Sequence, residues 1–145
     1  MTNEEYGRYV DALAPRSKTG KNLLNAFWVG GLICAIGQAL LNGYQALGLD
    51  ETTAGAAVSI SLVLLSAILT GFAVYDDIAK FAGAGTLVPI TGFANAVVAP
   101  AIEFQTEGFV LGTAAKMFTI AGPVIVYGLS ASVLYGVVYW ICSVI

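Results

Sequence analysis

The sequence has 145 residues, of which 58% are apolar and only 10% are charged, and its mean hydropathy is +0.83. A soluble domain carries about 25% charged residues, so this chain has too few charges to cover a surface in water and is expected to be an integral membrane protein. The net charge of −3 comes without a basic patch, which gives nucleic-acid binding no support, and histidine, the commonest general base and metal ligand, is absent.

Residues 1–21 form a polar arm before the first apolar run. A cleavable signal peptide would place its apolar region close to the start, so we expect the arm to be retained. Its composition is typical of a short interfacial helix or arm on the cytoplasmic side. The remainder, 22–145, is expected to form one transmembrane domain. The charged residues of the arm are Glu4, Glu5, Arg8, Asp11, Arg16, Lys18 and Lys21.

Four stretches without a charged residue follow, at 22–49, 52–75, 81–102 and 117–145. Each is longer than the roughly 20 residues that a helix needs to cross the hydrocarbon core. The first, second and fourth are predicted to be transmembrane helices, with aromatic residues such as Trp28 near their ends as interfacial anchors. The sequence therefore predicts an all-α, polytopic membrane protein with three clear transmembrane helices plus one irregular segment.

The irregular segment is 81–102. Glycine and proline interrupt helices, and in lipid a broken backbone must be buried in protein or line a watery cavity. We therefore predict two short helices around a break, or a re-entrant loop, shielded from lipid. The residues that motivate this prediction are Gly83, Gly85, Pro89, Gly92 and Pro100, together with the polar Asn95.

Positive charges predict the orientation of the chain, because lysine and arginine favour the cytoplasmic side. Arg16, Lys18 and Lys21 precede the first span, whereas the loop after it offers only Asp50 and Glu51. The N-terminus is therefore predicted to be cytoplasmic.

The side on which the chain ends depends on the irregular segment. If 81–102 spans the membrane, the C-terminus returns to the cytoplasm; if it is re-entrant, the C-terminus lies outside. Lys116 favours the re-entrant alternative, because a spanning segment would place this lysine on the outer side.

Polar residues inside the spans follow helical spacing. In the first span Gly31, Cys34, Gln38, Asn42 and Gln45 share one face, and in the second Ser59, Ser66 and Thr70 do so, with Asp77 continuing that face. Such stripes either line a hydrated path or pack helices together. The pore-lining candidates are Gln38, Asn42, Gln45, Ser59, Ser66, Thr70 and Asn95.

Three further groups complete the candidate residues. Gly128, Ser132 and Gly136 form a row of small residues that predicts close packing with another helix or subunit. Glu103 and Glu107 would share a face if their stretch is helical, and could then bind a divalent cation or simply mark a solvated helix end. Cys34 and Cys142 are interpreted as small buried hydrophobes. No nucleophile, phosphate loop or metal cluster accompanies the carboxylates Glu103 and Glu107, so no catalytic residue, metal or cofactor is predicted.

Three stretches carry a resemblance to a known family: AFWVGGLICAIGQAL, LTGFAVYDDIAKFAGAGTLVPITGFANA and EFQTEGFVLGTAAKMFTIAGPVIVYG. In order and spacing they closely resemble the stage V sporulation protein AC family over about residues 22–130. The run FAGAG-x-x-VP-x-TGFANA is its most specific part.

The resemblance implies a membrane subunit of a hetero-oligomeric complex in the inner membrane of the bacterial spore. Such a complex moves dipicolinic acid, as its calcium chelate, during sporulation and germination, and has been associated with tension-sensitive opening. The implied partners are the stage V sporulation proteins AD and AEb. Two alternatives from other classes remain, a structural membrane subunit that only scaffolds partners and a small membrane enzyme.

Overall fold

The computed structural model describes residues 2–13 and 18–144, and every element within these ranges is helical. Three helices are long and apolar enough to cross a membrane: α2, α3, and η3 joined to α6 over Phe109–Val144. The predicted all-α membrane architecture is therefore confirmed. The elements are α1 (Asn3–Leu13), α2 (Thr19–Ala46), α3 (Glu51–Gly71), α4 (Val74–Ala82), η1 (Gly83–Thr86), α5 (Pro89–Glu103), η2 (Gln105–Glu107), η3 (Phe109–Ala114) and α6 (Ala115–Val144). Arg16, used above for orientation, lies outside the described residues.

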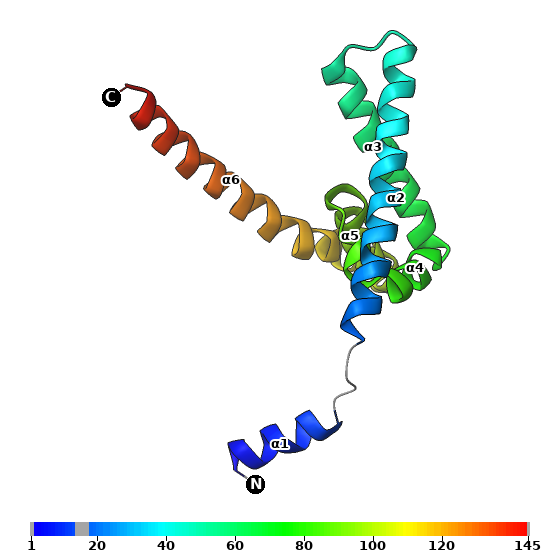
Figure 1. Cartoon of the computed structure of the whole chain (residues 1–145), viewed down its shortest axis with the longest axis vertical. Coiled ribbons are helices and arrows are strands. Elements are labelled where there is room, and N and C mark those ends of the chain that lie inside the picture. Colours follow the sequence, from blue (N-terminus) through cyan, green and yellow to red (C-terminus); the bar gives the residue numbers. More distant parts are fainter. Residues whose placement is uncertain (1, 14–17, 145) are drawn as a thin grey trace.

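α2 and α3 form a hairpin with a short connection (Figure 1). Asp50 caps α3, and its carboxylate accepts the amide N–H of Thr53 at 3.2 Å. Hydrogen bonding from Thr53, first through its side chain and then through its amide N–H, lowers the pKa of the Asp50 carboxyl, because it favours the charged form. Near the same end the hydroxyls of Tyr44 and Ser61 lie 2.7 Å apart and join the two helices. The buried face of α3 repeats every fourth residue: Ala54, Val58, Leu62 and Ser66.

α3 ends at Gly71, and the chain changes direction at Ala73, whose φ is +58°. This is a left-handed conformation that residues with a Cβ rarely adopt. Asp77 consequently belongs to α4, not to α3. The prediction that Asp77 continues the polar face of Ser59, Ser66 and Thr70 is wrong, because no single helix carries all four.

The irregular segment is broken, as predicted. α4 ends at Ala82, Gly83–Thr86 form the tight turn η1, and Pro89 opens α5, where its fixed φ suits a first helical position. η1 lies directly against α2: a Cβ on Gly85 would come within 2.5 Å of the carbonyl oxygen of Ala26. Only glycine permits such a close approach of two backbones.

Side chains bond the carbonyl oxygens that the break releases from regular helix. These donors matter because an unpaired backbone group costs several kcal/mol in hydrocarbon, by order of magnitude. Asn25 Nδ2 donates to Phe81 O at 3.1 Å, Thr86 Oγ1 donates to Gly83 O at 3.0 Å, and the Tyr75 hydroxyl donates to Thr86 O at 2.9 Å.

The segment enters and leaves at the same end of the α2–α3 hairpin. Ser66 of α3 bonds Thr91 of α5, and one turn later Thr70 of α3 meets Asn95 of α5, so the two helices run parallel. The end of α5 at Glu103 accordingly lies in one groove with Asp76, at the start of α4. This is the geometry of the re-entrant alternative.

η3 and α6 start where α5 finishes. The connection turns at Gly108, with φ +100°, and Lys116 Nζ lies 3.8 Å above the ring of Phe104. α6 has 30 residues and is therefore about 45 Å long. It diverges from the hairpin (Figure 1), and residues 123–144 are exposed along it. Most of the last helix therefore packs against no other part of the described chain.

The contact of Gly85 with α2 predicts a stability effect. Gly85→Ala should lower the thermal unfolding midpoint of the detergent-purified protein, because the Ala26 backbone cannot move aside as a flexible side chain could. Overpacking of this kind costs about 1–3 kcal/mol. Gly31→Ala is the matched control, since a Cβ there meets nothing within 4 Å. Equal midpoints for the two variants would contradict the contact.

Candidate functional site

An open groove of about 330 Å³ lies between α2, α3 and the start of α5. It brings together two of the predicted pore-lining residues, Gln38 from α2 and Ser59 from α3. Val88 and Ile90, on either side of Pro89, close one side of it. We call this site the polar groove after Gln38 and Ser59, which lie beside the N-terminus of α5 among walls that are otherwise mostly apolar.

The α2 stripe extends beyond the polar groove. Gln38 Nε2 donates to Asn42 Oδ1 at 2.9 Å, and both side chains and Gln45 are exposed. The stripe therefore faces away from the chain's own core. Gln38 links the groove to the rest of the stripe, since it belongs to both.

Ser66, Thr70 and Asn95 lie in the contact between α3 and α5. The Ser66 hydroxyl donates to the carbonyl oxygen of Thr91 at 2.7 Å and is buried. Thr70 Oγ1 lies 2.8 Å from both Ser66 O and the Asn95 side-chain oxygen. A hydroxyl has one proton and cannot donate to both oxygens. If the Asn95 amide is turned so that its nitrogen faces Thr70, Thr70 donates to Ser66 O and accepts from Asn95. In the single chain these three pore-lining candidates pack α3 against α5, as the packing alternative predicts.

An apolar cavity of about 170 Å³ adjoins this contact. Its walls include Val29, Ile36 and Leu69, and Thr91 reaches it from α5. The Thr91 hydroxyl is buried and has no hydrogen-bond partner among the described residues. Sequence reasoning missed Tyr75, which is buried and donates its hydroxyl to Thr86 O at 2.9 Å, because it lies at the edge of an uncharged run and looks unremarkable by spacing.

The two carboxylates belong to different elements. α5 ends at Glu103, whereas Glu107 lies in η2, so the condition that both share one helix face is not met. Both are exposed. Glu103 instead shares a groove of about 180 Å³ with Asp76 and Thr70. Within the described residues no group of three or more histidine, cysteine or acidic side chains could hold a metal ion.

Both cysteines are exposed free thiols. The expectation that they are buried is therefore wrong for the single chain. Cys34 lines the polar groove, and Cys142 lies near the end of the diverging helix α6.

Gly128, Ser132 and Gly136, which we call the α6 seam, are all exposed. A Cβ on either glycine would meet nothing within 4 Å. Within the described chain no helix uses this row of small residues, so it is available to another helix.

Comparison with known proteins gives two matches. A model of the family described as SpoVAC/SpoVAEB sporulation membrane protein matches residues 22–138. The chain is similar to "Stage V sporulation protein AC" of Bacillus subtilis (strain 168), with 48% identity over 141 residues, covering 95% of this chain and 94% of that protein. No solved structure matches the chain.

The α6 seam predicts an assembly effect. Gly128→Leu and Gly136→Leu should each reduce co-purification with partner subunits, because a large side chain keeps helix backbones apart. Ser132→Leu should act in the same direction. Val133→Leu, beside the seam on another face and also exposed, is the control. Wild-type recovery of partners with all three seam variants would show that the seam faces lipid.

Proposed function

The chain belongs to the SpoVAC/SpoVAEB family of sporulation membrane proteins, and we propose that it is a membrane subunit of a multi-subunit channel. This channel moves dipicolinic acid, with calcium, across the inner membrane of the spore. The observation that carries the proposal is the polar groove, where Gln38 and Ser59 lie beside the N-terminus of α5.

The groove has the chemistry that a dianionic solute needs. The first amide N–H groups of a helix have no partner within it, and they give its N-terminus a partial positive charge. In α5 these are the amides of Ile90 and Thr91, since Pro89 has none and the Gly92 amide already donates to Val88 O at 2.8 Å. Of these two residues only Ile90 lines the groove, because Thr91 is buried against the apolar cavity.

The Gln38 carboxamide keeps a second N–H beside the one bonded to Asn42, and neutral donors of this kind replace water without binding the anion tightly. The Ser59 hydroxyl donates to Gly55 O at 3.0 Å, so it can only accept.

The groove is open, so one chain supplies only part of a path. Its unused surfaces, the α2 stripe of Gln38, Asn42 and Gln45 and the α6 seam, support assembly with further membrane subunits. In this proposal the partners are the stage V sporulation proteins AEb and AD. Glu103 and Glu107 are exposed but belong to different elements, so in this proposal each would meet the calcium ion as a single carboxylate and not as a pair on one helix face.

The charges support a cytoplasmic N-terminus and an outer C-terminus. With a re-entrant segment, Lys18, Lys21, Lys80 and Lys116 all fall at one end of the hairpin, whereas Asp50 and the start of α3 fall at the other. Lysines concentrate on the cytoplasmic side of membrane proteins. α6 then crosses the membrane once more.

The alternative is a subunit that only scaffolds its partners. The packed contact of Ser66, Thr70 and Asn95 favours it, because these polar residues are already occupied within the chain. Flux and assembly must therefore be measured on the same variants.

Asn42→Asp should slow dipicolinate release from proteoliposomes that contain the complex. It keeps an acceptor for Gln38 but adds a charge that repels the dianion, with an effect of about tenfold or more at short range in a low-dielectric setting. Gln38→Leu and Asn42→Leu should slow release less. Asn22→Asp, at the first turns of α2, is the control.

The scaffold alternative predicts another result for the same variants. The leucine variants would assemble poorly, and release would fall only in proportion to the complex recovered. Normal release by Asn42→Asp in a fully assembled complex would remove Asn42 from the path.

The proposed topology is tested by tags at the two ends of the chain. In intact protoplasts that carry the protein in their cell membrane, a protease added outside should remove a C-terminal tag and leave an N-terminal tag intact. Protection of both tags would mean that the segment containing α4 and α5 crosses the membrane.

A further inference from the structure

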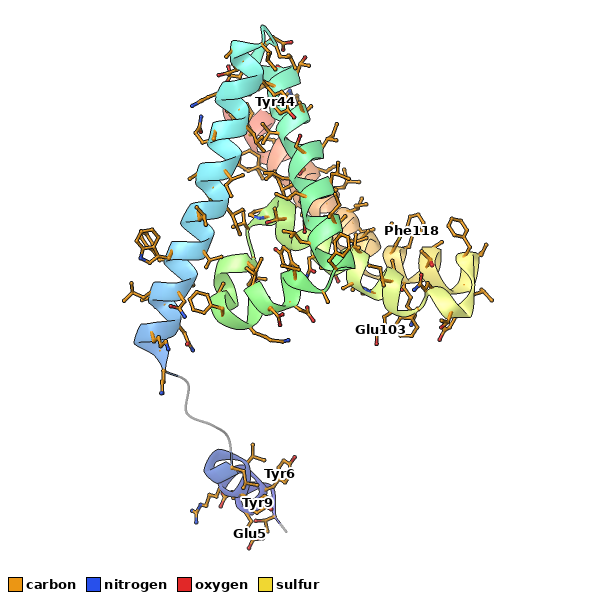
Figure 2. All side chains as sticks on the ribbon, turned by 90° about the vertical axis from the view of Figure 1, so that its right-hand side faces the viewer. Glu5, Tyr6, Tyr9, Tyr44, Glu103 and Phe118 are labelled. Carbon is orange, nitrogen blue, oxygen red and sulfur yellow. The ribbon has the colours of Figure 1, made fainter. Side chains whose placement is uncertain are left out.

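An apolar stripe runs along α1, the helix that lies within the polar arm. Tyr6, Tyr9, Val10 and Leu13 are exposed by 61%, 59%, 41% and 65%. They occupy positions i, i+3, i+4 and i+7, so they share one face of the helix. By the same spacing Glu4 and Arg8 lie on the opposite face. Figure 2 shows Tyr6, Tyr9 and Glu5 on α1, apart from the other helices.

α1 has a helix-start signal of its own that does not involve the bundle. The amide N–H of Thr2 donates to the Glu5 carboxylate at 2.8 Å, and the amide N–H of Glu5 donates to Thr2 Oγ1 at 3.3 Å. This reciprocal pair is a capping box, which fixes a helix start locally. Glu4 and Glu5 also lie in the first turn, where the helix dipole favours negative charge.

The covalent chain keeps α1 close to the membrane surface. Leu13, the last residue of α1, is six peptide links from Thr19, where the apolar helix α2 begins. At 3.8 Å per link, the two residues are at most about 23 Å apart. The bilayer that α2 enters is therefore the nearest large apolar phase that can cover the stripe.

We propose that α1 lies in the plane of the membrane interface, with Tyr6, Tyr9, Val10 and Leu13 inserted among the lipid headgroups. Tyrosine suits this region, because its ring is apolar and its hydroxyl reaches water. Most interfacial helices carry lysine and arginine on the polar face. The polar face of α1 instead has Glu4 and Glu5 against Arg8, so apolar insertion binds it and attraction to anionic lipid does not. This inference does not depend on the solute that the complex conducts.

The test uses the full-length protein in lipid nanodiscs, with both native cysteines replaced by alanine. A nitroxide label is attached to one introduced cysteine at a time, in Tyr9→Cys, Leu13→Cys, Glu4→Cys or Arg8→Cys. Oxygen concentrates in the apolar phase and a nickel chelate remains in water, so their collision rates with the label report its depth. Labels at positions 9 and 13 should favour oxygen several-fold over those at 4 and 8, in discs of uncharged phosphatidylcholine.

Three results would overturn the proposal. Equal access of the nickel chelate to all four labels would place α1 in water. Protection of positions 9 and 13 from both reagents would mean that protein covers the stripe, from a partner or a second copy. Insertion that occurs only in discs of anionic lipid would show that charge, and not the apolar stripe, holds α1 at the surface.

Discussion

A polypeptide that leaves helical conformation inside hydrocarbon must find new partners for its backbone hydrogen-bonding groups, and the structure of this chain depends on how it does so. Around the break between α4 and α5, donors come from side chains on three different elements: Asn25 on α2, Tyr75 on α4 and Ser66 on α3. Each bonds a carbonyl oxygen of the re-entrant segment. The hairpin thus supplies hydrogen bonds as well as an apolar surface, and the direction of α5 follows from where those donors lie.

The same constraint separates the polar residues into two roles. Ser66, Thr70 and Asn95 are committed within the chain, because their partners lie on the facing helix. Gln38 and Asn42 bond mainly each other and remain exposed. Close backbone contact makes the arrangement rigid, since Gly85 allows η1 to reach the α2 backbone at Ala26. As a result, the N-terminus of α5 is held in a fixed position beside the polar groove.

Composition and uncharged length were sufficient to predict the three spans and the break at the glycines and prolines, because hydropathy and backbone conformation are local properties. Contacts that depend on a single turn could not be predicted. Ala73 adopts a positive φ that nothing in the sequence predicts. The chain turns there, so Asp77 belongs to α4 and does not share a face with α3. The end of α5 at Glu103 likewise separates it from Glu107. Spacing identified Ser59 and Ser66 together, yet only tertiary structure separates the groove residue from the packed one.

The divergence of α6 separates two kinds of stability in this molecule. Residues 123–144 are exposed, so they make few contacts with the rest of the chain that unfolding could break. The thermal unfolding midpoint of the isolated subunit therefore reports the stability of the hairpin and the re-entrant segment, and depends little on α6. In the proposed complex, substitutions in the last helix would change stability only where another subunit packs against it. Because a helix in lipid satisfies its own backbone hydrogen bonds, α6 folds without a partner. In the proposed complex only its packing against another subunit depends on assembly, and that equilibrium shifts with protein concentration in the membrane.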